Sequence, residues 1–380
     1  MAFATGITVA SNYYAQPLLH SITSDLSVSM EHAGIIITIA QFSYALGLLF
    51  ITPLGDKFER KSLILALMLL STLGLAISAN ATSIEMLLVG TAIAGLFSAV
   101  AQVLIPFAAT IATPASRGRI VGVLMAGLLL GILLARTFAG TVSSFGQWRT
   151  VYAVAALIMA LVTICLAISL PRFSHKININ YWRLIGSIGS LFIQEPILRI
   201  RALMGGIAFC LFSLLWTPLA FLLSAEPYHY SDFIIGLFGI AGAAGALASP
   251  IVGRLSDKGR GILVTTVGLV ALLIAWLPLS FAQSSLCLLI LGIVVIDFAV
   301  QVTHVSCMNA IYQIRPEARS RMNSGYMVSY FIGGMIGSIS STYLFSLYGW
   351  LAIVYAGSGL AILALMIWVG YVKAVNRCQK

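Results

Sequence analysis

Residues 52–61 read Thr52-Pro-Leu-Gly-Asp56-Lys57-Phe-Glu59-Arg60-Lys61, a short charged loop between two long apolar segments at residues 32–51 and 62–79. A weaker copy lies in the second half of the chain and reads Gly253-Arg254-Leu-Ser-Asp257-Lys258-Gly-Arg260. Asp56 and Asp257 are 201 residues apart, and each is followed by Lys. The copy predicts that the chain consists of two related halves.

The composition excludes a soluble globular protein. Apolar residues make up 60% of the 380 residues and charged residues 8%, whereas a soluble domain carries about 25% charged residues. Lipid must therefore be the main solvent of this chain. The net charge of +10 does not indicate nucleic-acid binding, because the basic residues lie in small clusters scattered over the loops, a pattern that sets membrane topology.

The sequence carries no pattern for a cofactor or a metal. None of the five cysteines forms a CxxC pair, which argues against a zinc site and a disulfide framework. There is no Gly-x-x-x-x-Gly-Lys-Ser/Thr loop, so ATP does not drive the chain directly. We expect neither a cofactor nor a metal ion.

Twelve apolar segments are long enough to cross a membrane as helices, which need about 20 apolar residues each. They lie at residues 2–20, 32–51, 62–79, 84–108, 119–141 and 147–170, then at 200–224, 233–252, 261–280, 284–311, 320–345 and 350–372. Helices are favoured over strands because the segments are rich in Leu, Ala and Gly, and because an open sheet edge cannot face lipid.

The basic residues orient these segments. Arg136 lies within the fifth segment and Arg149 lies on the other side, but the remaining 19 of the 21 Lys and Arg share one side. These are Lys57, Arg60, Lys61, Arg117, Arg119, Arg172, Lys176, Arg183, Arg199, Arg201, Arg254, Lys258, Arg260, Arg315, Arg319, Arg321, Lys373, Arg377 and Lys380. Because positively charged loops stay in the cytoplasm, both termini and the Asp56 loop are predicted to be cytoplasmic.

A constant offset relates the two halves. Pro114 and Pro316 are 202 residues apart, and four further pairs of identical residues share this offset. These pairs are Arg117 and Arg319, Arg119 and Arg321, Gly131 and Gly333, and Trp148 and Trp350. A duplicated six-helix unit explains them, and parallel repeats are a known plan of transporters.

The repeat predicts three parts of the chain. The first six-helix bundle covers residues 1–170, a cytoplasmic central loop covers residues 171–199, and the second bundle covers residues 200–380. The central loop mixes Arg183 with aromatic neighbours such as Trp182, which suits a helix lying on the membrane surface.

The Asp56 loop favours a gating role. Asp56 would lie near the start of the third segment, where a carboxylate suits the positive end of a helix, and Arg60 and Lys61 could pair with it or with lipid phosphates. Such a charged latch can close the cytoplasmic side in one state and break in another. The alternative is a solvated turn whose charges only set topology, but the copy near Asp257 favours the latch.

The same loop resembles the signature Gly-x-x-x-Asp-Arg-x-Gly-Arg-Arg of the major facilitator superfamily. Thr52, Lys57 and Glu59 replace its first Gly, its first Arg and its second Gly, while Asp56, Arg60 and Lys61 match. The second copy keeps Gly253 and Asp257 and is one residue shorter. The resemblance covers the whole chain and is closest in type to bacterial drug/proton antiporters.

The resemblance implies an all-α membrane protein with twelve transmembrane helices in two pseudo-symmetric six-helix bundles. It implies alternating access around a central cavity, a location in the bacterial inner membrane, and a monomer. The residues that it places in cytoplasmic gating loops are Asp56, Lys57, Arg60, Lys61, Gly253, Asp257 and Arg260.

The fifth segment carries an unusual charge. Gly122 and Gly131 match the single glycines of the antiporter motif of this family, but Ala135-Arg136-Thr-Phe-Ala139-Gly140 stands where Gly-Pro-x-x-Gly-Gly is expected. Arg136 lies about 25 Å along the segment from Arg119. A charge inside the bilayer costs about 3 kcal/mol or more, so Arg136 either extends to the outer surface or contacts an anion or substrate in the cavity.

Asp297 is the acidic residue deep within a segment, about 20 Å into the tenth. A buried carboxylate resists ionisation, so it could load and release a proton. Gln301 and His304 follow at four and seven residues and share its helix face, and histidine titrates near physiological pH. The three form a candidate proton relay or a polar stripe for substrate. The alternatives are a structural hydrogen bond between helices and pairing with an Arg.

Further polar residues lie within the first, second and fourth segments. Asn12 and Gln16 are four residues apart on one helix face and are expected to line a cavity. Gln41 and Tyr44 in the second segment and Gln102 in the fourth are weaker candidates.

These observations predict a secondary transporter that exports a small hydrophobic or amphipathic solute in exchange for protons. The expected partners are a small-molecule substrate, protons and membrane lipid. A proton-linked sugar or metabolite permease is the alternative within transport. An intramembrane enzyme or a sensor is a remote alternative, because the chain lacks paired catalytic residues at depth and has no sizeable soluble domain.

Overall fold

The chain is helical throughout its described part. The computed structural model describes residues 1–113, 116–172, 181–246, 252, 255, 260–315 and 318–378, and every regular element in these ranges is a helix. The elements are α1 (Ala2–Ala10), α2 (Ala15–Leu26), α3 (Met30–Phe50), η1 (Thr52–Asp56), α4 (Arg60–Ala79), α5 (Ile84–Phe97), η2 (Ser98–Val100), α6 (Ala101–Ile111), α7 (Arg117–Ser143), α8 (Trp148–Ser169), α9 (Tyr181–Gln194), α10 (Pro196–Ser224), α11 (Asp232–Ala246), α13 (Gly261–Ile274), α14 (Trp276–Leu279), α15 (Leu286–Tyr312) and α16 (Arg319–Cys378).

The all-α membrane fold is confirmed, while the count of twelve crossings stays a prediction. Nine helices among the described residues are long and apolar enough to cross a membrane. They lie at His32–Gly55, Arg60–Ala79, Ile84–Ile111, Arg119–Ser143, Trp148–Ser169, Pro196–Ser224, Gly261–Leu279, Leu286–Tyr312 and Arg321–Ala374. The last covers two predicted segments, which Gly349 divides with its left-handed φ of 70°. The eighth predicted segment begins as the shorter apolar helix Asp232–Gly242.

Proline breaks explain two of the shorter helices. The first predicted segment is divided into α1 and α2 by turns at residues 11–14. Pro17 has no N–H to donate to the carbonyl of Tyr13, and its ring clashes with that carbonyl. Pro278 has the same relation to Ile274, which is the last residue of α13. Residues 11–14, where the backbone is irregular, carry the polar side chains of Ser11 and Asn12.

Two compact units make up the chain. The first comprises Met1–Gly186 together with Tyr230–Gly239, and the second comprises Ser187–His229 together with Ile240–Lys380. Helix α11 thus begins in the first unit and continues in the second. The predicted division into residues 1–170, 171–199 and 200–380 stays a prediction.

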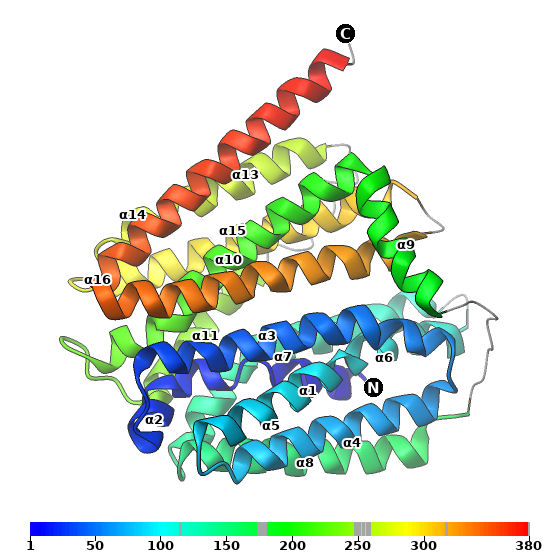
Figure 1. Ribbon diagram of the computed structural model, residues 1–380, viewed down its shortest axis with the longest axis horizontal. Helices are drawn as coiled ribbons and strands as arrows, with labels where there is room; N and C mark the ends of the chain where they lie inside the picture. The colour runs from blue at the N-terminus through cyan, green and yellow to red at the C-terminus, as the bar shows by residue number, and fades with distance from the viewer. Residues whose placement is uncertain are drawn as a thin grey trace. The chain divides into compact units, whose positions relative to one another are not determined.

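A glycine contact holds the central helix of the first unit. Residues Ala4–Ala10 of α1 are all buried, and α1 packs along α7 (Figure 1). A Cβ atom on Gly131 of α7 would overlap the backbone of Gly6 in α1. The two backbones can therefore approach this closely only because both positions lack a side chain.

The second unit repeats this arrangement. Helix α10 is its most buried helix, and it packs along the first part of α16 (Figure 1). A Cβ atom on Gly333 would overlap the backbone of Gly206. Gly333 is the residue that the constant offset of 202 pairs with Gly131, so the two related glycines make equivalent contacts in the two units.

Replacing Gly131 by Leu should lower the midpoint of thermal unfolding in detergent, because the side chain would force α1 and α7 apart. Gly122→Leu is the matched control in the same helix, since Gly122 has open space around its Cα atom. That variant should unfold at the wild-type temperature or slightly above it, because Gly in a helix costs about 0.5–1 kcal/mol relative to Ala. Equal midpoints for the two variants would show that the glycine contact does not limit stability.

Candidate functional site

Arg136 is buried inside the first unit. Its side chain is 2% exposed, and its Nε donates a hydrogen bond to Oε1 of Gln16 at 2.6 Å. The guanidinium carbon lies 5.4 Å from the centre of the Tyr13 ring. Arg136 therefore points toward Gln16 of α2 and toward Tyr13 in the turn before it, and its contact with an anion or substrate stays a prediction.

The first predicted segment, which is divided into α1 and α2, supplies further polar side chains near Arg136. Asn12 donates from Nδ2 to Oγ of Ser98 in η2 at 2.9 Å. Oδ1 of Asn12 and Nε2 of Gln16 are among the buried side-chain atoms that have no hydrogen-bond partner in the described part of the chain. Unpaired buried polar atoms are costly, so both atoms suit contact with a polar ligand.

The candidates from the second and fourth segments are buried as well. A hydrogen bond joins the side chains of Tyr44 in α3 and Gln102 in α6, and Tyr44 lies close enough to Tyr13 for an electrostatic interaction. Gln41 is 2% exposed in the same helix as Tyr44. Tyr44 and Gln102 thus extend the cluster around Arg136, and Gln41 lies one helical turn before Tyr44.

Asp297 lies in the interior of the second unit. Its side chain is 8% exposed, and Nε1 of Trp216 in α10 donates a hydrogen bond to its Oδ1 at 2.9 Å. Its Oδ2 lies where a Cβ atom of Gly242 in α11 would be. The carboxyl group therefore packs between three helices, and the missing side chain at Gly242 makes the space for it.

His304 has partners of its own. Its Nδ1 lies 3.0 Å from the hydroxyl oxygen of Tyr326, and its ring centre lies 4.7 Å from that of Tyr330. Gln301 lies between Asp297 and His304 on α15 and is half-buried. Asp297 is thus bonded to α10 and His304 to α16, and the relay along one helix face stays a prediction.

A series of aromatic rings connects α10 and α16, the two helices that contact Asp297 and His304 of α15. Trp216 lies 6.0 Å from Phe212 between ring centres, Phe212 lies 5.3 Å from Phe209, and Phe209 stacks on Tyr330 at 4.2 Å. We name Trp216, Phe212, Phe209 and Tyr330 the aromatic column. It is a buried, largely apolar group of rings in the second unit, while the cluster around Arg136 in the first unit is polar.

Arg201 is a buried charge for which the sequence offers no signal. The pattern of basic residues groups it with the inner loops, but α10 begins at Pro196, and Arg201 is 4% exposed. Its Nη1 donates to Oγ1 of Thr265 at 2.5 Å, and its guanidinium lies 4.7 Å over the ring of Trp368. These partners lie far along the chain, so sequence spacing cannot reveal them.

Hydrogen bonds of Arg60 and Glu59 order the loop after α3. Arg60 donates from Nε to the carbonyl of Gly55 at 3.1 Å and from Nη1 to Oγ1 of Thr110 at 2.9 Å. Glu59 caps α4 by accepting hydrogen bonds from the backbone N–H groups of Lys61 and Ser62, a role that the sequence analysis missed. Its signal is an acidic residue just before a helix start.

The latch stays a prediction. Lys57 is exposed and Lys61 is half-buried, but the side chain of Asp56 lies outside the described part of the structure. In the second copy, Gly253 and Asp257 lie outside the described residues, and the exposed Arg260 precedes α13.

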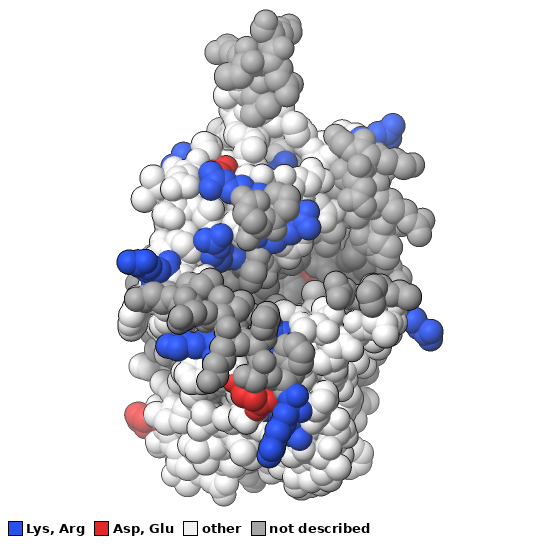
Figure 2. Space-filling model, turned by 90° about the vertical axis from the view of Figure 1, so that its right-hand side faces the viewer, with Lys and Arg blue, Asp and Glu red and all other residues white. Residues whose placement is uncertain are grey.

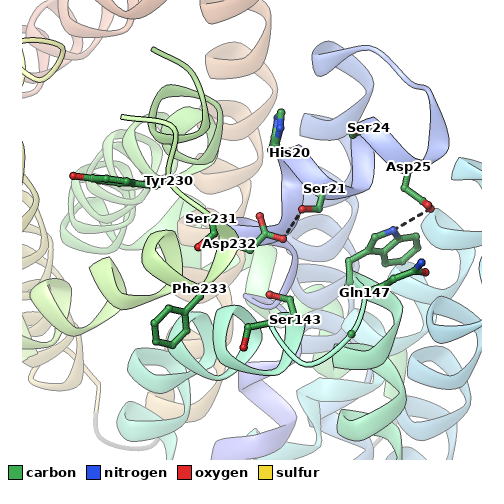
Figure 3. Close-up of a pocket in the computed structure, with 13 residues that line it drawn as sticks. His20, Ser21, Ser24, Asp25, Ser143, Gln147, Tyr230, Ser231, Asp232 and Phe233 are labelled. Carbon is green, nitrogen blue, oxygen red and sulfur yellow. Dashed lines mark hydrogen bonds between the residues drawn. The ribbon is translucent and has the colours of Figure 1, made fainter. Parts of the chain in front are cut away.

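A polar pocket of about 550 Å³ lies in the first unit beside the end of α2, the turn between α7 and α8, and the start of α11 (Figure 3). Ser21 of α2 donates a hydrogen bond to Oδ2 of Asp232 at 2.5 Å. Asp25 accepts from the guanidinium of Arg149 and from Nε1 of Trp148, and these two donors hold the pKa of the Asp25 carboxyl below its usual range. Sequence reasoning did not find this pocket, because residues more than two hundred positions apart line it.

The fold agrees with comparisons to known proteins. The sequence model of the Major Facilitator Superfamily matches residues 1–313 and 202–378. The chain belongs to the major facilitator superfamily. This facilitator is 50% identical to the uncharacterized transporter YgaY of Escherichia coli O157:H7, over 97% of this chain and 93% of the relative. It is 27% identical to the inner membrane transport protein YnfM of Escherichia coli strain K12, over 68% of this chain and 63% of that protein.

Solved structures show the same fold. A crystal structure of a mutant of the nucleoside transporter NupG superposes with a TM-score of 0.77 at 13% identity, over 97% of this facilitator and 98% of that chain. A bacterial homologue of the human lysosomal transporter Spinster, in an inward-facing and unoccupied conformation, superposes with a TM-score of 0.72 at 17% identity. The match covers 97% of this facilitator and 95% of that chain. Its membership of the superfamily and its similarity to YgaY make the facilitator a multi-pass membrane transporter of small molecules and not an enzyme.

A double-mutant cycle should reveal the coupling between Gln16 and Arg136. Gln16→Leu removes an acceptor from a buried cation, and hydrogen bonds to charged groups contribute about 1.5–3 kcal/mol. The variant should therefore unfold in detergent at a lower temperature than wild type. Adding Arg136→Met should cost less in the Gln16→Leu background than in the wild type, because the charge that needs the acceptor is then absent. Gln283→Leu, at an exposed position, is the control, and additive losses would contradict the coupling.

Proposed function

We propose that this facilitator exports a small hydrophobic or amphipathic solute in exchange for protons, and that Asp297 carries the proton. The observation behind this proposal is the burial of the Asp297 carboxyl group within a membrane-spanning helix, against Trp216 and Gly242. Acidic residues at this depth are rare and are usually part of an ion pathway.

Protonation of Asp297 would change one bond between helices. The ionised carboxylate accepts a charge-assisted hydrogen bond from Nε1 of Trp216, which is about twice as strong as a neutral one. When a carboxylate oxygen takes up a proton, the charge is lost and this link between α10 and α15 weakens. Proton binding would therefore loosen the packing of α10, and proton release would tighten it.

The aromatic column supports an amphipathic cargo. Its buried rings form an apolar environment directly beside the Trp216 indole that holds Asp297. A solute bound against these rings would be sensitive to the protonation of Asp297, which is the coupling that exchange requires.

The alternative is a proton-linked permease for a sugar or another polar metabolite. The unpaired Oδ1 of Asn12 and Nε2 of Gln16 favour it, because amide groups suit a solute rich in hydroxyl groups. A nucleoside is such a solute, and the structural neighbour NupG is a nucleoside transporter.

Transport by Asp297→Asn in proteoliposomes tests the proton carrier. The variant keeps the shape of the side chain but cannot bind the exchanged proton, so dye efflux driven by a pH gradient should be abolished, while exchange of solute down its own gradient continues. His304→Ala should shift the pH optimum without stopping transport. The assay uses ethidium and other fluorescent amphipathic dyes, with labelled uridine for the permease alternative.

Asp25→Asn is the matched control, since it removes a carboxyl group at a helix end and should keep proton-driven transport. If Asp297 only supports the structure, its Asn variant should be poorly expressed and less heat-stable. A well-folded Asp297→Asn protein with full proton-driven transport would remove the residue from the mechanism.

We also propose that both termini are cytoplasmic in the bacterial inner membrane. The supporting observation is that 19 of the 21 Lys and Arg share the loops on one side of the predicted segments, as positive-inside topology requires. Figure 2 shows Lys and Arg side chains gathered on the face that it draws. Reporter fusions after Asp25 and Glu226 should then be periplasmic, and a fusion after Lys176 should be cytoplasmic. A periplasmic signal after Lys176 would reverse the orientation.

A further inference from the structure

An apolar groove of about 450 Å³ lies on the second unit between α10 and the first part of α16. Its walls are mostly apolar, and Leu203, Ile332 and Ile336 are exposed along it by 45%, 38% and 49% of their surface. These side chains lie on helices that span the membrane. An open apolar groove of this size at that place is a site for a molecule with a hydrocarbon chain.

The glycine contact of the second unit creates the groove. Gly206 and Gly333 bring the backbones of α10 and α16 together, and both glycines line the groove. Because neither glycine has a side chain, the bottom of the groove lies close to the helix backbones. The side chains of Leu203 and Ile336 form its walls on either side. The groove is therefore a consequence of close helix packing and is formed before any ligand binds.

The length of the groove fits one leaflet of a bilayer. On α10 it extends from Arg199 to Cys210, which is about 16 Å at 1.5 Å per residue. The hydrocarbon core of a bilayer is about 30 Å thick, so the groove spans about half of it. That is the depth that the acyl chain of one phospholipid occupies.

A cationic group marks one end of the groove. Arg199 lies in the first turn of α10, is exposed and lines the groove. In the described part of the chain it makes one hydrogen bond, from Nη1 to the carbonyl of Ile193 at 3.3 Å, which leaves most of its five N–H donors available. Its neighbour Glu195 is already paired with Arg315 at 2.7 Å. The charge of Arg199 is therefore available to an external anion.

We infer that this groove binds one anionic phospholipid, with the phosphate at Arg199 and an acyl chain along Gly206 and Gly333. The arginine fork suits a phosphate group, and the apolar walls suit the chain. Phe192, near the end of α9, also lines the groove. The neighbouring Ile193 of this helix is 77% exposed, as expected for a helix lying at the membrane surface. The bound lipid would pack against α9 and connect it to the two long helices.

Native mass spectrometry of the purified full-length chain tests this site. Phosphatidylglycerol and phosphatidylethanolamine with identical acyl chains are titrated separately, and the affinity of the first bound lipid is measured. The wild type should prefer phosphatidylglycerol by about fivefold, because a basic side chain near an anionic surface contributes about 1 kcal/mol. Arg199→Gln should remove this preference.

Two further kinds of variant complete the design. Arg183→Gln removes an exposed cation of α9 that does not line the groove, and it should keep the preference. Leu203→Trp and Ile336→Trp fill the groove from opposite walls and should weaken binding of both lipids severalfold. Two positions are used so that a folding defect in one, detected by thermal unfolding, does not decide the result.

A preference that persists in Arg199→Gln would overturn the assignment of the headgroup. An equal loss in Arg199→Gln and Arg183→Gln would show that general surface charge, and not this site, selects the lipid. Unchanged binding in both folded Trp variants would show that the acyl chain lies elsewhere.

Discussion

The contact between two glycine backbones, once in each unit, sets the arrangement of the other helices. Gly6 against Gly131 and Gly206 against Gly333 allow α1 and α10 to lie in the centres of their units. Lipid offers no hydrophobic force between helices, so close backbone packing must hold them together. A central helix then loses contact with lipid along most of its length. Polar side chains on such a helix, or just after it, are protected there, which is why Gln16 of α2 and Trp216 of α10 can serve as partners for buried charges.

Neutral groups hydrogen-bond three buried charges in the described part of the chain. Arg136 is bonded to the Gln16 amide, Asp297 to the Trp216 indole and Arg201 to the Thr265 hydroxyl. A neutral donor or acceptor satisfies a hydrogen bond without cancelling the charge. Removing one of these neutral partners would take a hydrogen bond from a buried charge, which is costly.

The sequence predicted the elements well and the partners poorly, for physical reasons. Apolar length alone identifies the helices, because the bilayer has a fixed thickness. The rare charges Arg136 and Asp297 stand out because the bilayer penalises them. Their partners do not stand out, since glutamine and tryptophan are ordinary at many positions and the contacts join distant segments. The distribution of basic residues assigns Arg201 to an inner loop. The residue is buried because α10 already begins at Pro196 and because its guanidinium packs over Trp368.

The glycine contacts have a consequence for how related sequences can diverge. Each contact involves two positions that must stay small together, because a side chain on either one meets the backbone of the other helix. Such a pair cannot change by independent substitutions, and a larger residue at one position requires the helices to separate before the other is free to vary. The Gly206 and Gly333 pair also forms the floor of the groove on the second unit. Drift at these two positions would therefore alter the helix packing and the lipid-facing surface in a single step.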